Sequence, residues 1–367
     1  MGYNDKRKEY EAIFSLLAYK DELSVEKNDQ FRDLDWVYIA GQLINNRVVG
    51  IAWYTMQNNQ LILQNVPSEI KKAFKIIYEG QKIRTQTLRN YVDDIASALT
   101  ENKVPYVFLK GTILSKVLYE EGMRASNDID VLVMKEKISK CGNALQEIGY
   151  IQGDISESGE IEKVDRKELV FRLMNWGETV PLVKIINKPF ATNVNVDINF
   201  SLDWLPTGSE VAIKEFIDNA VMYNSVNGIQ WASLNIVNFL LHLCVHLYKE
   251  CVLYEMIEYN KDLQLYKFVD IYAYVRQFNI NWEEFVKECF NHKLQQACYL
   301  ALQYTCEFFP CLCEDERLTG VLKQIKPQQP FSLDDVIDPR NGKNYKWAIP
   351  LKHRVFMTKK TAYLKEV

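Results

Sequence analysis

Two aspartates stand one residue apart inside an apolar run, "DIDVLV" at residues 128–133. Side chains alternate along a β-strand, so Asp128 and Asp130 share one face while Ile129, Val131 and Val133 share the other. Two like charges on one face of a buried strand repel each other and lose hydration. The chain must therefore place a compensating group beside this strand, and a divalent cation is the first candidate.

A later strand-like run offers a third carboxylate. In "NVNVDINFSL", residues 193–202, apolar and polar side chains alternate, and Asp197 lies on the polar face. If this strand neighbours the first, three carboxylates meet at the mouth of a sheet, which suits Mg²⁺ and its preference for oxygen ligands. Two such ions can hold the attacking and leaving oxygens of a phosphoryl displacement. The alternative, equally weighted for "DID" alone, is that Asp128 caps the strand and Asp130 pairs with Arg124.

The segment upstream of the aspartates favours the metal interpretation. "FLKGT", residues 108–112, reads as a strand that runs into a helix through Gly111. Backbone N–H groups at the start of such a helix, together with the Thr112 hydroxyl, can meet a phosphate. A strand, a Gly-Thr turn, a helix and an Asp-x-Asp strand would bring an anion site and a metal site together.

The order of patterns predicts an α+β protein with a small mixed sheet between an N-terminal helical segment and a C-terminal helical bundle. We expect helix through most of residues 1–103, all sheet strands within about 104–202 of a domain spanning 104–205, and helices across 206–326. One helix is expected from Pro67 to about residue 104, and another across "WEEFVKECFNHKLQQACYLALQYTCEFF". Residues 151–168 are read as a loop or an edge excursion, and 327–367 as a basic tail.

Composition narrows the function classes. The formal net charge of −4 argues against a protein built mainly to wrap nucleic acid. No run approaches the length of a membrane span and the first residues are charged, so we expect a cytoplasmic protein without membrane association. The 8 cysteines lack zinc-type spacing. Most are expected to be small buried hydrophobic residues in a reducing compartment.

The stretch "LKGTILSKVLYEEGMRASNDIDVLV" resembles the nucleotidyltransferase superfamily with the polymerase-beta-like fold, whose motif joins a Gly-Ser turn, an hDhDh strand and a third Asp. It is most similar to the bacterial uncharacterised nucleotidyltransferase family, where a Lys-Gly turn, an arginine and a "DID" strand follow one another. "NVNVDINFSL", "LLHLCVHLYKE", "FVDIYAYV" and "INWEEFV" extend the resemblance over roughly residues 30–310.

The resemblance implies roles for particular residues. Asp128, Asp130 and Asp197 would bind Mg²⁺, and Gly111 and Thr112 would hold nucleotide phosphates. Thr112 replaces the superfamily's serine but keeps its hydroxyl. Asn199 stands where this family is expected to have a histidine, so a role for that histidine does not carry over.

Other polar residues are further candidates for the site. Lys110 and Arg124 are candidate cations for a nucleoside triphosphate, the alternative for Arg124 being a pair with a loop carboxylate. Asp270 is expected to bond to Lys267 or a helix end. A polar stripe on an otherwise apolar helix either lines the acceptor site or is satisfied within the core; it consists of Asn238, His242 and His246.

The function expected from these residues is Mg²⁺-dependent transfer of a nucleoside monophosphate from an NTP to an acceptor. A small hydroxylated molecule ranks first as acceptor, then a protein side chain as in toxin-like enzymes, then RNA. The competing hypothesis is a catalytically silent module that binds a nucleotide or a partner. The tail from Arg340 to Lys365 contains eight Lys or Arg and no acidic residue. Such a tail either docks an anionic acceptor or is simply solvated.

Overall fold

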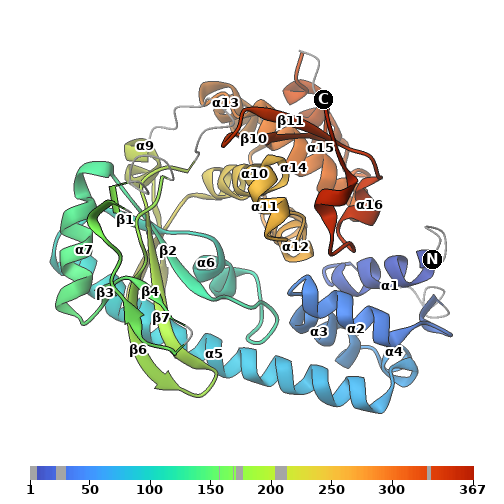
Figure 1. Cartoon of the computed structure of the whole chain (residues 1–367), viewed down its shortest axis with the longest axis horizontal. Coiled ribbons are helices and arrows are strands. Elements are labelled where there is room, and N and C mark those ends of the chain that lie inside the picture. The colour runs from blue at the N-terminus through green and yellow to red at the C-terminus, as the bar shows by residue number, and fades with distance from the viewer. Residues whose placement is uncertain are drawn as a thin grey trace.

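A mixed β-sheet with helices on two sides gives the chain its α+β fold (Figure 1). The computed structural model describes residues 6–21, 30–156, 158–167, 169–170, 177–202, 213–328 and 332–367. In Figure 1 the sheet stands on the left, the N-terminal helices lie at the lower right and the C-terminal helices at the upper right. The fold class expected from the sequence is confirmed.

The N-terminal segment is helical, as predicted. It comprises α1 (Arg7–Leu17), α2 (Trp36–Asn45), α3 (Val49–Gln57), α4 (Gln60–Asn65) and the long α5 (Ser68–Glu101). After α5, Lys103 adopts a left-handed φ of 49° and the N–H of Val104 bonds back to the carbonyl of Leu99, which ends the helix. One half of α5 packs against α3 and the other against the sheet, so this helix joins the two parts (Figure 1).

The main sheet has the strand order β3-β6-β7-β2-β1-β9-β8. Its central strands are β1 (Tyr106–Phe108), β2 (Asp128–Val133) and β7 (Ala191–Asn199), flanked by β3 (Ile151–Gln152) and β6 (Leu182–Lys188). β2 runs parallel to β7 and antiparallel to β1. Helix α6 (Lys110–Val117) packs against β2, and α7 (Ile138–Glu147) against β7. Thus β2 and β7 are neighbours, the condition for their aspartates to meet.

One expectation about this part was wrong. Strands β8 (Val221–Asn224) and β9 (Gln230–Ser233) extend the sheet beyond residue 202, because β9 pairs with β1 and its Trp231 bonds through Nε1 to the buried Asp93 of α5. Residues 151–168, read as a loop or an edge excursion, contain the edge strand β3 and the small hairpin of β4 (Asp154–Ile155) and β5 (Ile161–Glu162), which fits the second alternative. These contacts span long stretches of sequence, which local periodicity does not reveal.

Helices close the other side of the molecule, as α9 (Ile213–Asp218), α10 (Ile236–Val252), α11 (Tyr254–Glu258), α12 (Leu265–Gln277), α13 (Trp282–Asn291), α14 (Gln295–Phe308) and α15 (Glu316–Ile325). The single long helix expected from residue 282 is divided into α13 and α14. Lys293, at φ 56°, turns the chain between them. None of the described helices has the length and apolar character needed to cross a bilayer. All eight cysteines are free thiols, and only Cys311 and Cys313 are not buried.

The basic tail is ordered in its described part. β10 (Asp335–Asp338), β11 (Lys343–Trp347) and β12 (Leu364–Glu366) form a second, antiparallel sheet, with α16 (Leu351–Arg354) between β11 and β12. Many of its cations are paired with carboxylates: Arg340 with Asp338 and Glu258, Lys343 with Glu366, Lys346 with Asp335, Arg354 with Asp334, and Lys360 with Asp262. These pairs serve packing and leave less basic surface for an anionic acceptor than the sequence suggested.

Candidate active site

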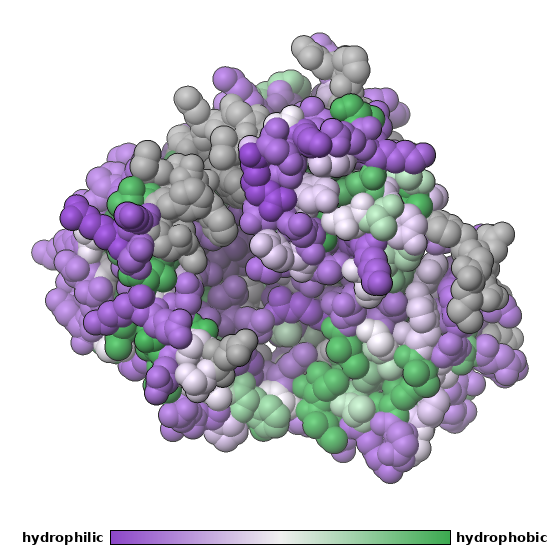
Figure 2. All heavy atoms as spheres, viewed as in Figure 1, coloured by the Kyte–Doolittle hydropathy of each residue, from purple (hydrophilic) through white to green (hydrophobic). Residues whose placement is uncertain are grey.

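A cavity of about 430 Å³ lies between the sheet and the C-terminal helices. Figure 2 shows the corresponding face hollowed near its centre, with hydrophilic residues gathered there. The lining includes residues from the start of α6, residues 124–128, Asp130 of β2, Asp197 of β7, helices α10 and α12, the turns around α11, and Arg47 of the N-terminal segment. Small-molecule sites in proteins are typically of this size, roughly 300–1,000 Å³. The cavity is therefore in the size range of a small-molecule site.

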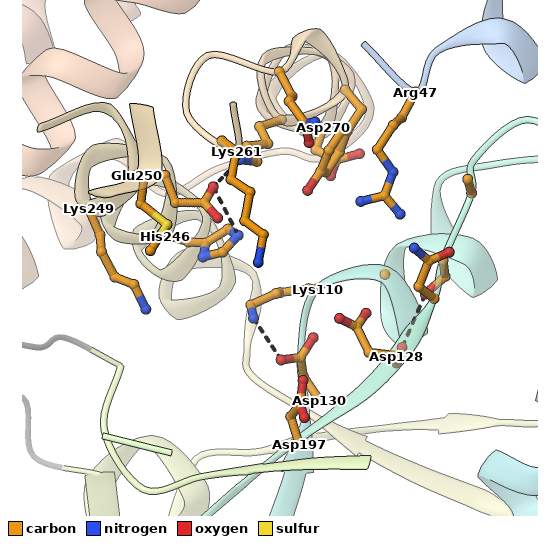
Figure 3. Close-up of a pocket in the computed structure, with 18 of the residues that line it drawn as sticks. Arg47, Lys110, Asp128, Asp130, Asp197, His246, Lys249, Glu250, Lys261 and Asp270 are labelled. Atoms are coloured by element: carbon orange, nitrogen blue, oxygen red, sulfur yellow. Dashed lines mark hydrogen bonds and ion pairs between the residues drawn. The ribbon is translucent and has the colours of Figure 1, made fainter. Parts of the chain in front are cut away.

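The three predicted carboxylates converge on the floor of this cavity (Figure 3). Asp130 of β2 and Asp197 of β7 are direct partners in the parallel register, and Asp128 lies two residues before Asp130. Glu178 adds a fourth carboxylate to the lining. Asp130 is only 2% exposed. Like charges are crowded here with little water around them.

Burial and mutual repulsion act on these acids in the same direction. Burial, followed by the charges of Asp130, Asp128 and Glu178, raises the pKa of Asp197 well above its ordinary value. The pKa of Asp128 is raised by desolvation and by Asp130, although its side chain still reaches solvent at the cavity wall. No hydrogen bond or ion pair reaches these two carboxylates from the described residues. The cluster thus carries negative charge that the protein compensates only in part.

Lys110 supplies that partial compensation. Its Nζ lies 2.6 Å from Oδ1 of Asp130, and Nδ2 of Asn199 donates to the same oxygen at 3.3 Å. Burial disfavours the ammonium, but Asp130 and Asp128 outweigh this and hold the pKa of Lys110 above its ordinary value. The alternative that Asp130 pairs with Arg124 is wrong, because Lys110 occupies that place.

The Gly-Thr turn at the start of α6 is divided between two cavities. Gly111 lines the large cavity, and a Cβ there would lie 2.7 Å from Oγ of Ser126 and 3.1 Å from Nη1 of Arg124. A side chain at this position would therefore require the Ser126 hydroxyl or the Arg124 guanidinium to move. Thr112 instead lines a neighbouring cavity of about 20 Å³, where its hydroxyl is buried without a hydrogen-bond partner among the described residues. The expected contact of this hydroxyl with the phosphates is not supported by its position.

Arg124 is held by a helix carboxylate. Its Nη2 lies 2.7 Å from Oδ2 of Asp270 on α12, its Nε bonds to both oxygens of that carboxylate, and the pair is buried. Tyr119 donates its hydroxyl to Asp270 at 2.7 Å. The expectation that Asp270 bonds to Lys267 or a helix end was wrong. Arg124 borders the cavity, but its positive charge is largely neutralised by this pair.

The polar stripe on α10 is also divided. His246 lines the cavity, while Asn238 and His242 are buried away from it and do not line it. Burial, with smaller effects from neighbouring charges, lowers the pKa of His242 to about 3, and neither ring nitrogen has a partner in the described residues. Nε2 of His246 lies 3.6 Å from Glu250, which also forms an ion pair with Lys267. Burial and nearby lysines lower the pKa of His246 well below its ordinary value, so both histidines are neutral.

Comparison with known proteins gives this arrangement a family. A family model described as "Uncharacterised nucleotidyltransferase" matches residues 32–310. The chain belongs to this family. No curated protein matches it significantly. Among solved structures, the chain is similar to an antigenic nucleotidyltransferase-like protein from Paracoccidioides brasiliensis, at 15% identity and a TM-score of 0.39 over 65% of this chain and 92% of that one.

Nucleotidyltransferase family membership raises the question of a metal, and the donor set fits one chemically. Asp128, Asp130, Asp197 and Glu178 present hard oxygen atoms, which magnesium prefers. Within the described residues, however, no three Asp, Glu, His or Cys side chains are already arranged as a metal centre. Lys110 stands beside Asp130 in that place. Oxygen donors are thus present, with the Lys110 ammonium in contact with one of them.

Several lining residues of this nucleotidyltransferase chain were missed from the sequence: Arg47, Glu178, Lys249, Glu250, Lys261 and Tyr266. For Glu250 there was a signal, because it lies one helical turn after His246 on the same helix. Arg47 stands in a turn between two helices, far in sequence from the aspartates. Nothing in its local pattern pointed to the cavity.

Proposed function

We propose that the chain is a Mg²⁺-dependent nucleotidyltransferase that moves a nucleoside monophosphate from an NTP to an acceptor and releases pyrophosphate. The observation that carries this proposal is the register of β2 and β7, which sets Asp130 opposite Asp197 beside the glycine turn of α6 in one cavity. Carboxylates on one side and cations on the other suit a metal-bound triphosphate.

Transfer breaks the bond between the α-phosphorus and its bridging oxygen and forms one between that phosphorus and the acceptor oxygen. The acceptor loses a proton and pyrophosphate leaves. Asp128, Asp130 and Asp197 would hold magnesium. When bound, the ion would stabilise the charge that develops on these oxygens. Backbone N–H groups at Gly111, at the start of α6, would bind a phosphate.

Lys110 and a proton acceptor complete the residues assigned by the proposal. The Lys110 ammonium, which contacts Asp130 and lines the cavity, would also be available to a phosphate oxygen of a bound donor. Two lining groups can accept a proton from the acceptor: His246, which is neutral, and Asp197. The rest of the chain positions these groups.

The acceptor is proposed to be a small hydroxylated molecule. A cavity of about 430 Å³ with both signs of charge fits a compact polar ligand beside the nucleotide. A protein side chain or an RNA end ranks lower, since many cations of the C-terminal sheet are already paired. Incubation of a cell lysate with labelled NTPs, followed by separation into metabolite, protein and RNA fractions, tests this ranking. Label confined to protein or RNA would overturn it.

Calorimetry and a pyrophosphate assay test the reaction itself. ATP, CTP, GTP and UTP are titrated with and without magnesium, and pyrophosphate release is followed with lysate fractions as acceptors. The proposal expects magnesium-dependent binding of at least one NTP and release of pyrophosphate. Tight binding without release for every fraction would favour the competing hypothesis of a catalytically silent binding module.

A further inference from the structure

Arg47 reaches the cavity from a turn that the rest of the protein fixes in place. The turn joins α2 to α3, and Arg47 adopts a left-handed φ of 59°. Its neighbour Asn46 is 1% exposed, accepts from the N–H of Leu265 at 3.1 Å and donates to the carbonyl of Val355 at 3.3 Å. A left-handed backbone is unfavourable for a non-glycine residue and is maintained only where the surroundings hold it.

The Arg47 side chain points toward the carboxylate floor. Its guanidinium lies 5.3 Å from the centre of the Tyr266 ring, and Figure 3 shows it extending across the cavity toward Asp128. Its positive charge acts on that aspartate, opposing the increase in pKa that burial causes. A guanidinium over an aromatic face is oriented while its N–H groups stay available to a ligand.

Three other cations of the cavity differ in one respect. Lys110 is paired with Asp130, Arg124 with Asp270 and Lys267 with Glu250. Among the described residues, no ion pair to a carboxylate involves Arg47 or Lys261, which also lines the cavity and enters it in Figure 3. Arg47 and Lys261 thus place positive charge opposite the acidic floor, and no described carboxylate forms an ion pair with either of them.

From these observations we infer that Arg47, oriented by Tyr266 and assisted by Lys261, binds the β- and γ-phosphates of the donor, the part that leaves as pyrophosphate. The inference rests on the proposed function and adds to it a role for the N-terminal helical segment, which completes the donor site. A guanidinium donates two parallel hydrogen bonds to phosphate oxygens, so Arg47 discriminates triphosphates from monophosphates.

Inorganic probes separate this role from recognition of the base. Calorimetry with tripolyphosphate, pyrophosphate and phosphate compares the wild type with Arg47→Gly. Glycine removes the guanidinium and adopts a φ of 59° without steric cost, so the variant is expected to keep its fold. The affinity for tripolyphosphate and pyrophosphate should fall about ten- to a hundredfold, with little change for phosphate. Arg47→Lys should bind between the two.

Matched variants and the NTPs give the contrary outcomes. Arg7→Ala removes an equal charge from an exposed residue of the same segment, which pairs with Glu11 on the same helix, and should bind like the wild type. Tyr266→Leu should weaken tripolyphosphate binding in the same direction as Arg47→Gly, but less. If the wild type binds an NTP and Arg47→Gly binds it and tripolyphosphate equally well, the inference is wrong while the proposed function stands. If the wild type binds neither any NTP nor tripolyphosphate, both are wrong.

Discussion

Asp130 of β2 and Asp197 of β7 lie side by side on adjacent parallel strands, in direct register. Cα atoms paired in this way lie about 5 Å apart, so two carboxylates on the same face are held close by the backbone itself. No rearrangement of loops is needed to bring them together. The strands therefore fix the spacing of the two acids.

The first prediction concerns Asp128 and Asp197, whose carboxylates have no partner among the described residues. Replacing Asp128 and Asp197 together by asparagine should lower pyrophosphate release at least about a thousandfold, because the charge that would hold magnesium is lost. The fold should persist, since the change relieves like-charge repulsion. Thermal unfolding tests the metal separately: added Mg²⁺ should raise Tm of the wild type and leave that of the variant unchanged.

Asp94→Asn is the matched control for that experiment, because Asp94 is exposed on α5 and does not line the cavity. It should behave as the wild type in both assays. Full transferase activity in the double variant would contradict the assignment of the carboxylates. An equal rise of Tm with magnesium in all three proteins would place metal binding elsewhere.

The second prediction follows from His242. Its folded-state pKa of about 3 lies below the ordinary value of 6.5, so the unfolded chain binds a proton that the folded chain does not between these values. This residue therefore costs stability as pH falls from 6.5 toward 3, by about 1.4 kcal/mol for each pH unit. His242→Leu should lack this slope. Urea unfolding at pH 7, 5.5 and 4.5 measures it, and parallel curves for both proteins would refute it.

A third prediction tests the buried pair of Arg124 and Asp270. Asp270→Ala leaves the guanidinium buried without its partner and should cost about 3–5 kcal/mol of unfolding free energy. Replacing both residues, as Arg124→Met with Asp270→Leu, should recover most of that loss because no unpaired charge remains. Urea denaturation gives all three values. A double variant as unstable as the single one would show that the cost arises from packing.

The fourth prediction distinguishes the two residues of the turn. Gly111→Ala places a Cβ 2.7 Å from Oγ of Ser126, so it should cost about 1–3 kcal/mol and weaken nucleotide binding by displacing the segment before β2. Adding Ser126→Ala should restore part of both. Thr112→Val should leave nucleotide affinity unchanged, because the hydroxyl is buried outside the large cavity. A loss of affinity in Thr112→Val measured by calorimetry would instead support the phosphate contact expected from the sequence.

The parts of the fold that sequence could predict are those encoded locally. Alternation within "DIDVLV" placed Asp128 and Asp130 on one face, and the same rule placed Asp197 on the polar face of its strand. The partner of Arg124 lies 146 residues away, and the pairing of β9 with β1 likewise joins distant segments. The packing of α6 determines which cavity the Thr112 hydroxyl lies beside. Such facts are set by tertiary contacts that no local window contains.

The hydrogen bond from Asn46 to the carbonyl of Val355 has a consequence for the order of synthesis. A ribosome makes the turn that carries Arg47 early, and the segment that anchors it near the end of translation. Elements made first can fold first, but this turn acquires its last anchor only after residue 355 has emerged. A nascent chain halted before that point would contain all of the carboxylates and every strand of the large sheet, with Arg47 still not fully anchored.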